Sequence, residues 1–334
     1  MTRLGNRLGW VVLLAGAGMG TFGLGPAEAK EEAKEGPVAA ARNDTATTAG
    51  AARPSAGKPA ASPTGKRKRT SAETASAKRG PLPAERLESL RLTLSGPDDP
   101  AAIEAATALG GSGATNAAEP IVEMLATGGS PGRTEAALDA LGKLAETEAL
   151  GTNGQRTLEI LELYAGHRVP DLRRRAIKAL GALREPRFSE AVIPILLARL
   201  GDEAPEVRAA AGEALASRRE TKATPRLFAL LKRGDAGAAS PLAALAAPEL
   251  VPQIAELAGS VDDALLATTL GEYAKRDDVP DKLRLDVVRT IGGLPGADAT
   301  TALVEYIASV PAKDNRPSKR EAQKLLDQRG SGRP

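Results

Sequence analysis

The 334-residue chain contains no cysteine, a single histidine (His167) and only seven aromatic residues. Without cysteine it cannot form disulfides, thiolate metal sites, iron–sulfur clusters or a cysteine nucleophile. One histidine excludes a zinc or di-iron centre built on several imidazoles. Because aromatic side chains are scarce, the interior is expected to consist of leucine, alanine, valine and isoleucine. We therefore expect neither a metal nor a cofactor.

Residues 1–29 have the pattern of a secretory signal peptide. Arg3 and Arg7 form a positive start, the uncharged stretch from 10 to 25 is mostly apolar, and Ala27 and Ala29 provide small residues for cleavage. A membrane-spanning helix needs about 20 apolar residues, so the stretch is short for an anchor. The pattern predicts cleavage after Ala29 and an exported protein, periplasmic or extracellular. An uncleaved membrane anchor is the alternative.

Residues 30–81 are rich in alanine, threonine, serine, proline and basic residues, and Val38 is their only large aliphatic residue. This composition predicts a disordered linker, because too little apolar surface is available to offset the entropy of ordering. Its net charge is +6, densest at Lys66, Arg67, Lys68 and Arg69. Two interpretations stay open, a solvated tether or a contact with an anionic envelope polymer or lipid.

Residues 82–310 alternate two helical patterns. In the first, proline opens the helix, arginine follows, and a Leu-Gly-type ending comes seven residues after the arginine, as in 170–183, 205–216 and 284–294. In the second, proline in the first turn precedes an apolar residue by two positions, as at 120, 194, 225 and 252. A complete pair takes about 30–39 residues, which is typical of an α-solenoid. We predict an all-α fold of about six pairs, roughly 98–129, 130–168, 169–203, 204–236, 237–260 and 279–310, with 261–278 as an extra helix.

The Pro-x-Val-Arg start and the Ala-Leu-Gly ending, followed by a proline-initiated helix, resemble HEAT repeats. The most similar type is the bacterial HEAT-like repeat of phycobilisome lyases. The resemblance implies a structural arginine ladder, here Arg173, Arg208 and Arg284, with Asp171, Asp202 and Asp278 as possible acidic partners and a break at Thr134. It also implies that the second helices line a concave face. The polar positions on those helices are the candidate partner-binding residues: Glu119, Glu123, Glu159, Glu162, Arg199, Arg226, Lys232, Glu256 and Glu305.

No motif in the sequence indicates catalysis. There is no Gly-x-Ser-x-Gly elbow and no phosphate-binding loop. His167 follows a helix and is interpreted as a complement to the helix dipole. HEAT-like DNA glycosylases use aromatic residues, but the one tryptophan, Trp10, lies in the signal peptide. We therefore expect that the protein is not an enzyme.

Charge favours a protein partner over nucleic acid. Residues 82–310 have a net charge of −8, which disfavours duplex DNA, and the tail 311–334 has +4. Two basic runs, Arg173–Arg175 and Arg218–Arg226, are interpreted as solvated helix faces. The tail is expected to form a short capping helix. We expect a monomeric, exported scaffold that binds a protein partner in the cell envelope through its concave face. The alternative is an envelope-binding module held by its basic linker.

Overall fold

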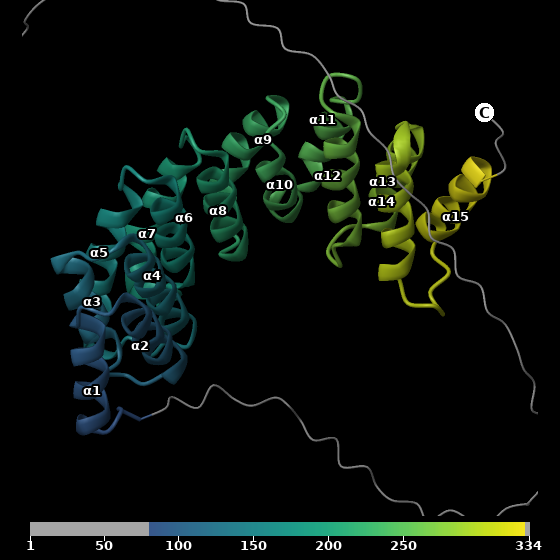
Figure 1. Ribbon diagram of the computed structural model, residues 1–334. Coiled ribbons are helices and arrows are strands. Elements are labelled where there is room, and N and C mark those ends of the chain that lie inside the picture. Colours follow the sequence, from purple (N-terminus) through teal and green to yellow (C-terminus); the bar gives the residue numbers. More distant parts are fainter. Residues whose placement is uncertain (1–79, 331–334) are drawn as a thin grey trace, which may run out of the picture. The chain divides into compact units, whose positions relative to one another are not determined.

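The computed structural model describes residues 80–330, and every regular element in that range is a helix (Figure 1). This confirms the all-α prediction. The signal-peptide pattern and almost all of the basic linker lie outside the described residues. All the helices belong to one compact unit, Arg69–Pro334. Within residues 80–330, no helix has the length and hydrophobicity needed to cross a bilayer.

Fifteen α-helices and four short 3-10 helices make up this part of the chain. The α-helices are α1 Ala84–Ser95, α2 Asp99–Ser112, α3 Ala118–Thr127, α4 Pro131–Glu146, α5 Gly154–Ala165, α6 Pro170–Ala182, α7 Pro186–Arg199, α8 Pro205–Ser217, α9 Thr224–Lys232, α10 Ala239–Leu245, α11 Val251–Ala255, α12 Asp263–Lys275, α13 Asp281–Gly293, α14 Gly296–Ser309 and α15 Pro317–Gly330. The 3-10 helices are η1 Gly151–Asn153, η2 Thr221–Ala223, η3 Ala236–Ala238 and η4 Pro248–Leu250.

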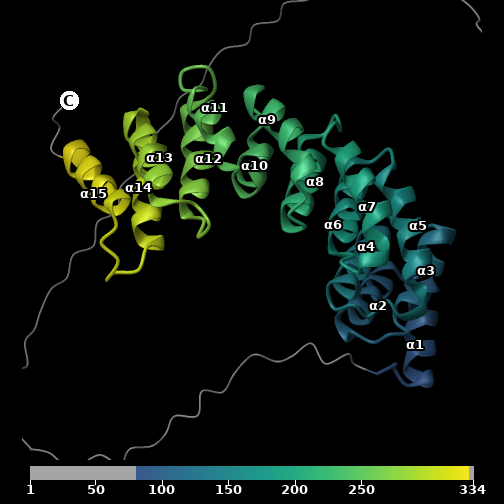
Figure 2. The same cartoon turned by 180° about the vertical axis from the view of Figure 1, so that it is seen from behind.

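The helices form two rows, one even-numbered and one odd-numbered. The helices α2, α4, α6, α8, α10, α12 and α14 pack closely in series, whereas α1, α3, α5 and α7 form a looser series. Over α1–α10, Figures 1 and 2 show the even row on the inner side of the bend and the odd row on the outer side. Crowding on the inner side is consistent with the closer packing of the even row.

The predicted pair boundaries at residues 168 and 203 differ from the structure by one helix, whereas the predicted pair 279–310 coincides with α13 and α14. Helix α5 packs extensively on α6, and α7 on α8, whereas α4 scarcely touches α5 and α8 scarcely touches α9. In the middle of the stack a pair therefore runs from an odd helix to the following even helix. Helix α12, expected to be an extra helix, continues the even row by packing on α14. Spacing along the sequence places the helices correctly, but it does not reveal which neighbour each helix packs against.

The Leu-Gly endings are the closest points between even helices. A Cβ atom added at Gly110 would lie 2.7 Å from the Cα of Ala140, so α2 and α4 approach backbone to backbone. The same glycine-to-alanine contact recurs down the row: Gly142 with Ala179, Gly181 with Ala214, and Gly271 with Ala302. A side chain at Gly110 or Gly181 would separate the helices, because its Cβ would lie within 2.8 Å of an alanine, whereas at Gly142 the distance of 3.6 Å is an ordinary contact.

The core consists mainly of leucine and alanine, as predicted, but it also holds all three tyrosines. The hydroxyl of Tyr164 donates to the carbonyl oxygen of Leu125 at 3.0 Å, and the hydroxyl of Tyr306 shares a hydrogen bond with Ser318 of α15 at 2.6 Å. Helix α15 packs on α13 and α14, with Leu325 against Gly292. The C-terminal helix thus covers the last pair of the stack.

Candidate functional site

Two arginine–aspartate pairs, the first buried and the second partly exposed, link an even helix to the loop before the next even helix. The Nε and Nη2 atoms of Arg173 donate to the two carboxylate oxygens of Asp202 at 3.0 and 2.7 Å. Only 6% of the Arg173 side chain and 4% of the Asp202 side chain are exposed. The Nε of Arg208 donates to Asp235 at 2.5 Å in the same way. Arg173 and Arg208 therefore form the arginine ladder implied by the resemblance.

In each ladder pair, the arginine and the aspartate also form hydrogen bonds with backbone groups. Arg173 donates to the carbonyl oxygens of His167 and Arg168, and Arg208 donates to those of Asp202 and Glu203. Asp202 accepts from the backbone N–H of Ala204, and Asp235 from that of Gly237, both at 3.0 Å. The ladder side chains are thus occupied within the fold.

The Arg173–Asp202 pair is held in its charged form. Burial alone would raise the pKa of Asp202, but the hydrogen bonds from Arg173 and from the Ala204 N–H outweigh burial, and the pKa is lowered. The hydrogen bond to Asp202 raises the pKa of Arg173 despite its burial. These shifts have a structural cause and do not indicate catalysis.

Arg284 departs from the ladder. Its expected partner Asp278 pairs with Arg276 at 2.5 Å. Arg284 is buried and donates instead to the carbonyl oxygens of Ala274 at 2.8 Å and Arg276 at 2.6 Å. It therefore anchors the loop between α12 and α13, which is a structural role without a ladder partner.

One other expected partner differs, and one actual partner was not expected. Asp171 pairs with Arg174 and Arg175 of its own helix rather than with Arg173. Asp235, the partner of Arg208, was missed from the sequence. The position of Asp235 could have identified it. Asp235 precedes a turn and lies 27 residues after Arg208, much as Asp202 lies 29 residues after Arg173.

The nine candidate partner-binding residues lie mostly on the odd row. Glu119 and Glu123 lie on α3, Glu159 and Glu162 on α5, Arg199 on α7, Arg226 and Lys232 on α9, Glu256 directly after α11, and Glu305 on α14 of the even row. Over α1–α10 the odd row is the outer side of the bend, whereas the resemblance implied a concave position (Figure 1). Their role in partner binding stays a prediction.

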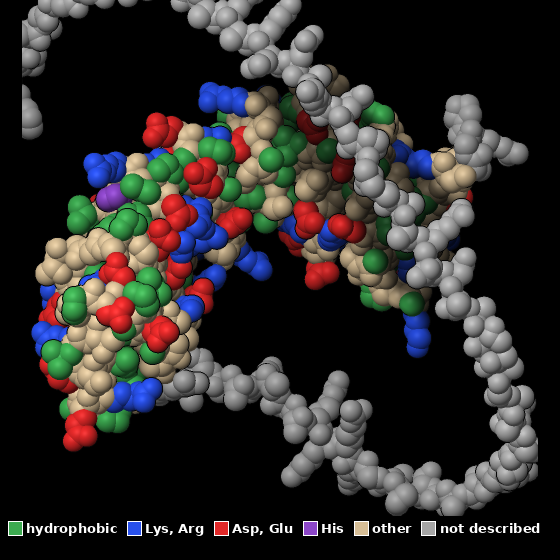
Figure 3. All heavy atoms as spheres, viewed as in Figure 1, with side chains coloured by type: hydrophobic (Ala, Val, Ile, Leu, Met, Phe, Trp, Pro, Cys, Tyr) green, Lys and Arg blue, Asp and Glu red, His purple; other side chains and the backbone are tan. Residues whose placement is uncertain are grey.

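Exposed leucines lie among the acidic candidates. Leu92 on α1 is 65% exposed and Leu163 on α5 is 67% exposed, the two highest values among the exposed large apolar side chains of residues 80–330. Glu123 pairs with Arg91, the neighbour of Leu92, at 3.2 Å. Figure 3 shows apolar and acidic side chains side by side over this end of the unit. We call the exposed faces of α1, α3 and α5 the acidic outer surface.

Several candidates already have partners within the chain. Glu159 accepts from Gln155 at 3.1 Å, and Glu305 pairs with Lys275 at 2.7 Å. The Lys232 ammonium lies 4.4 Å from the centre of the Phe228 ring. Such contacts orient these side chains at the surface without burying them.

His167 has only structural contacts. Its Nδ1 accepts from the backbone N–H of Val169 at 3.1 Å, and its ring stacks on Tyr164 with centroids 5.8 Å apart. Among the described residues there is no group of three or more histidine, aspartate or glutamate side chains arranged to hold a metal ion. The basic candidates Lys66, Arg67, Lys68 and Arg69 lie outside the described range.

The central part of the chain matches a known repeat family. Residues 157–246 match the family model described as HEAT repeats. This match begins in α5 and ends directly after α10, so it follows the odd-to-even pairing seen in the structure. None of the curated proteins matches the chain.

The chain is also similar to several solved structures. One is the complex of CpcE and CpcF of phycocyanin lyase from Nostoc sp. PCC7120, with 20% identity, coverage of 77% of this chain and 99% of that chain, and a TM-score of 0.38. Another is a designed armadillo repeat protein, with 18% identity, coverage of 72% and 98%, and a TM-score of 0.32.

Proposed function

We propose that this HEAT-repeat chain is a non-enzymatic scaffold that binds a protein partner through its acidic outer surface. The exposure of Leu92 and Leu163 on stacked, rigid helices carries the proposal. Apolar anchors surrounded by polar side chains are typical of protein-binding surfaces. Because the helices already hold their positions, binding requires little further ordering of the backbone.

The charge of this surface describes its partner. The three helices of this surface, α1, α3 and α5, contain six acidic and three basic side chains, a net charge of −3. A partner with an apolar pocket and a basic rim would bury the leucines and complement the carboxylates. The carboxylates would then mainly set specificity and the rate of encounter, and the leucines would supply most of the affinity.

The proposal also includes the cellular location of the protein. The signal-peptide pattern of residues 1–29 supports export, which would place the scaffold in the cell envelope. The basic linker would then separate the repeats from the membrane or contact anionic material there.

In-cell photo-crosslinking tests the scaffold function. A photoreactive amino acid at position 163 is expected to crosslink one defined protein, whereas the same group at exposed Thr268 of α12 is not. The substitution Leu163→Asp should abolish capture of that protein. Val304→Asp is the matched control, because Val304 is also an exposed apolar residue, 50% accessible, on a different helix. Equal capture by Leu163→Asp and wild type would refute the proposal.

A second function is supported by the +6 charge of residues 30–81. In this alternative the basic linker binds anionic lipid or polymer and the repeats are secondary. Replacing Lys66, Arg67, Lys68 and Arg69 by glutamine should then abolish salt-sensitive cosedimentation with vesicles containing phosphatidylglycerol. Unchanged cosedimentation of this variant would rule the alternative out.

A further inference from the structure

The net charge of the repeats conceals an alternation along the chain. Residues 82–166 have a net charge of −8, residues 167–236 have +6, and residues 237–310 have −6. The basic segment spans α6 to α9 and therefore lies between two acidic segments. An anionic ligand would be attracted only to this middle part of the stack.

Most arginines at the start of the basic segment are already paired. Arg173, Arg174, Arg175 and Arg208 all form ion pairs. Around α9 the situation differs, since five exposed cations form no ion pair with any carboxylate of residues 80–330: Arg219, Lys222, Arg226, Lys232 and Arg233. No carboxylate of residues 80–330 neutralises this exposed positive charge, although Arg226 donates to a backbone carbonyl and Lys232 lies over the Phe228 ring.

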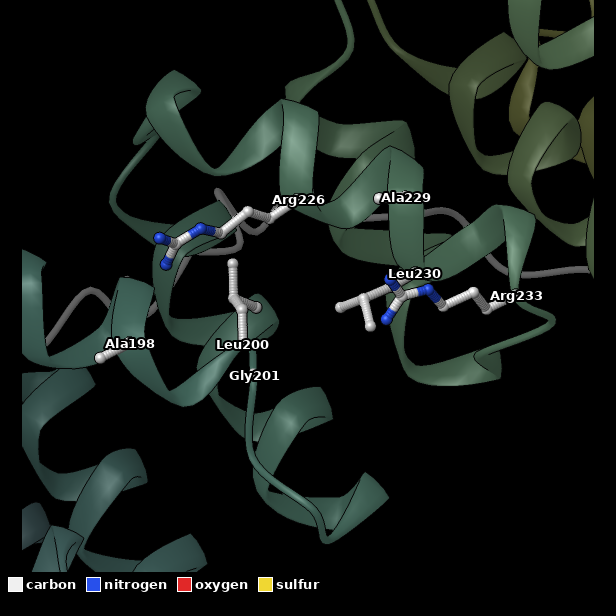
Figure 4. Close-up of a pocket in the computed structure, with 7 residues that line it drawn as sticks. All are labelled: Ala198, Leu200, Gly201, Arg226, Ala229, Leu230 and Arg233. Carbon is white, nitrogen blue, oxygen red and sulfur yellow. The ribbon is translucent and has the colours of Figure 1, made fainter.

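Two of these cations stand at the edges of a hollow. The hollow has a volume of about 370 Å³ and lies between the end of α7 and α9. Figure 4 shows the Arg226 and Arg233 guanidinium groups on either side of Leu200 and Leu230. Ala198, Gly201 and Ala229 complete the lining. Arg226 also donates a hydrogen bond to the carbonyl oxygen of Leu197, which fixes the direction of its side chain.

The nearest carboxylates do not neutralise this hollow. A second hollow of about 360 Å³ adjoins it and shares Leu200, Gly201, Leu230 and Arg233. Its two carboxylates, Asp202 and Asp235, are both bound to the ladder arginines. Arg233 and the guanidinium nitrogens of Arg226 other than the Nη1 bonded to Leu197 therefore keep donors available to a ligand.

We propose that this hollow binds an acidic peptide segment of a protein, in which one apolar side chain is flanked by carboxylates. The planar guanidinium groups match carboxylates geometrically, and each can donate two parallel hydrogen bonds. The apolar side chain lies on Leu200 and Leu230 and removes them from water. The site is separate from the acidic outer surface and takes a segment of the opposite charge.

The surroundings favour a short peptide over a longer polyanion. A duplex nucleic acid or an anionic membrane would extend over the neighbouring acidic segments and be repelled there. A phosphate group would gain nothing from contact with the apolar side chains of Leu200 and Leu230. A segment of a few residues satisfies both the two arginines and the two leucines.

Fluorescence anisotropy with a labelled peptide tests the site. The probe is fluorescein-Gly-Ser-Glu-Asp-Leu-Asp-Glu-Ser-Gly, titrated with the full-length chain. The double variant Arg226→Gln/Arg233→Gln is expected to bind at least tenfold more weakly. The matched control is Lys143→Gln/Lys282→Gln, which removes the same charge from two exposed lysines on α4 and α13. This control should bind within twofold of wild type.

Three results would overturn the proposal. The first is equal weakening by both double variants, which would indicate unspecific attraction. The second is equal binding of a peptide with serine in place of the leucine, which would remove the role of the apolar floor. The third is equally strong competition by inorganic polyphosphate or phosphatidylglycerol vesicles at matched charge. Crosslinking at position 163 should be unchanged in Arg226→Gln/Arg233→Gln, so failure here is distinguishable from failure of the scaffold function.

Discussion

Two neighbouring glycines of α2 should respond to alanine in opposite directions. Gly110 faces α4, and its added Cβ would lie 2.7 Å from the Cα and 2.8 Å from the Cβ of Ala140. Gly111 has no atom within 4 Å of its added Cβ. The same substitution on the same helix therefore differs only in the contact it creates.

The magnitudes follow from two competing effects. Alanine improves helix propensity over glycine by up to about 1 kcal/mol. At Gly110 the methyl meets backbone that cannot rotate away, so the two helices must move apart, and overpacking of this kind costs about 1–3 kcal/mol. We expect Gly110→Ala to lower the free energy of unfolding by roughly 1–2 kcal/mol. Gly111→Ala should raise it by about 0.5 kcal/mol, because the residue lies in the last turn.

Urea unfolding followed by circular dichroism measures both effects. The denaturation midpoint should shift down for Gly110→Ala and slightly up for Gly111→Ala, with the same slope as wild type. If Gly110→Ala were as stable as wild type, the backbone contact between α2 and α4 would not be the reason for the Leu-Gly ending.

Three further predictions concern buried polar groups. Asp202→Ala should lower the free energy of unfolding by about 3 kcal/mol, because the buried Arg173 loses its bidentate partner and keeps only the exposed Glu203 and two backbone carbonyls. Calorimetry should show a smaller loss for Arg173→Leu/Asp202→Ala. The pKa of Asp202 is lowered from 3.8 in the folded protein, so its pair with Arg173 stabilises the fold above about pH 4, and this stabilisation is lost as the pH falls below the folded pKa. When unfolding is followed during acid titration, Asp202→Asn should lose less stability than wild type over this pH range. Tyr306→Phe should cost about 1 kcal/mol by losing the bond to Ser318, and hydrogen exchange should then be faster in α15.

The sequence predicted the helices because their ends carry local signals. Prolines mark helix starts, as at Pro170 and Pro205, and the Leu-Gly endings mark the contacts of the even row. The ladder member Arg173 was also predicted, because its position recurs in the repeat. These features depend on residues that are close in the chain.

The pairing of helices and some site contacts were not predictable in this way. Both α5 and α6 bury apolar residues, and only the folded structure shows that α6 packs on α5 rather than pairing with α7. Arg284 does not contact its expected partner Asp278, which pairs with Arg276, and donates to backbone carbonyls instead. The hollow beside Arg226 forms between two helices whose approach no local pattern specifies.

The ladder also has a direction, and this affects how the chain folds during synthesis. Each arginine binds a carboxylate that follows it by 27 or 29 residues, in the loop before the next even helix. Because the N-terminal side of the chain is synthesised first, Arg173 is made before its partner Asp202, and Arg208 before its partner Asp235. Each central repeat can neutralise its ladder arginine only when the following repeat has begun to emerge. Folding in this region therefore advances one repeat behind synthesis.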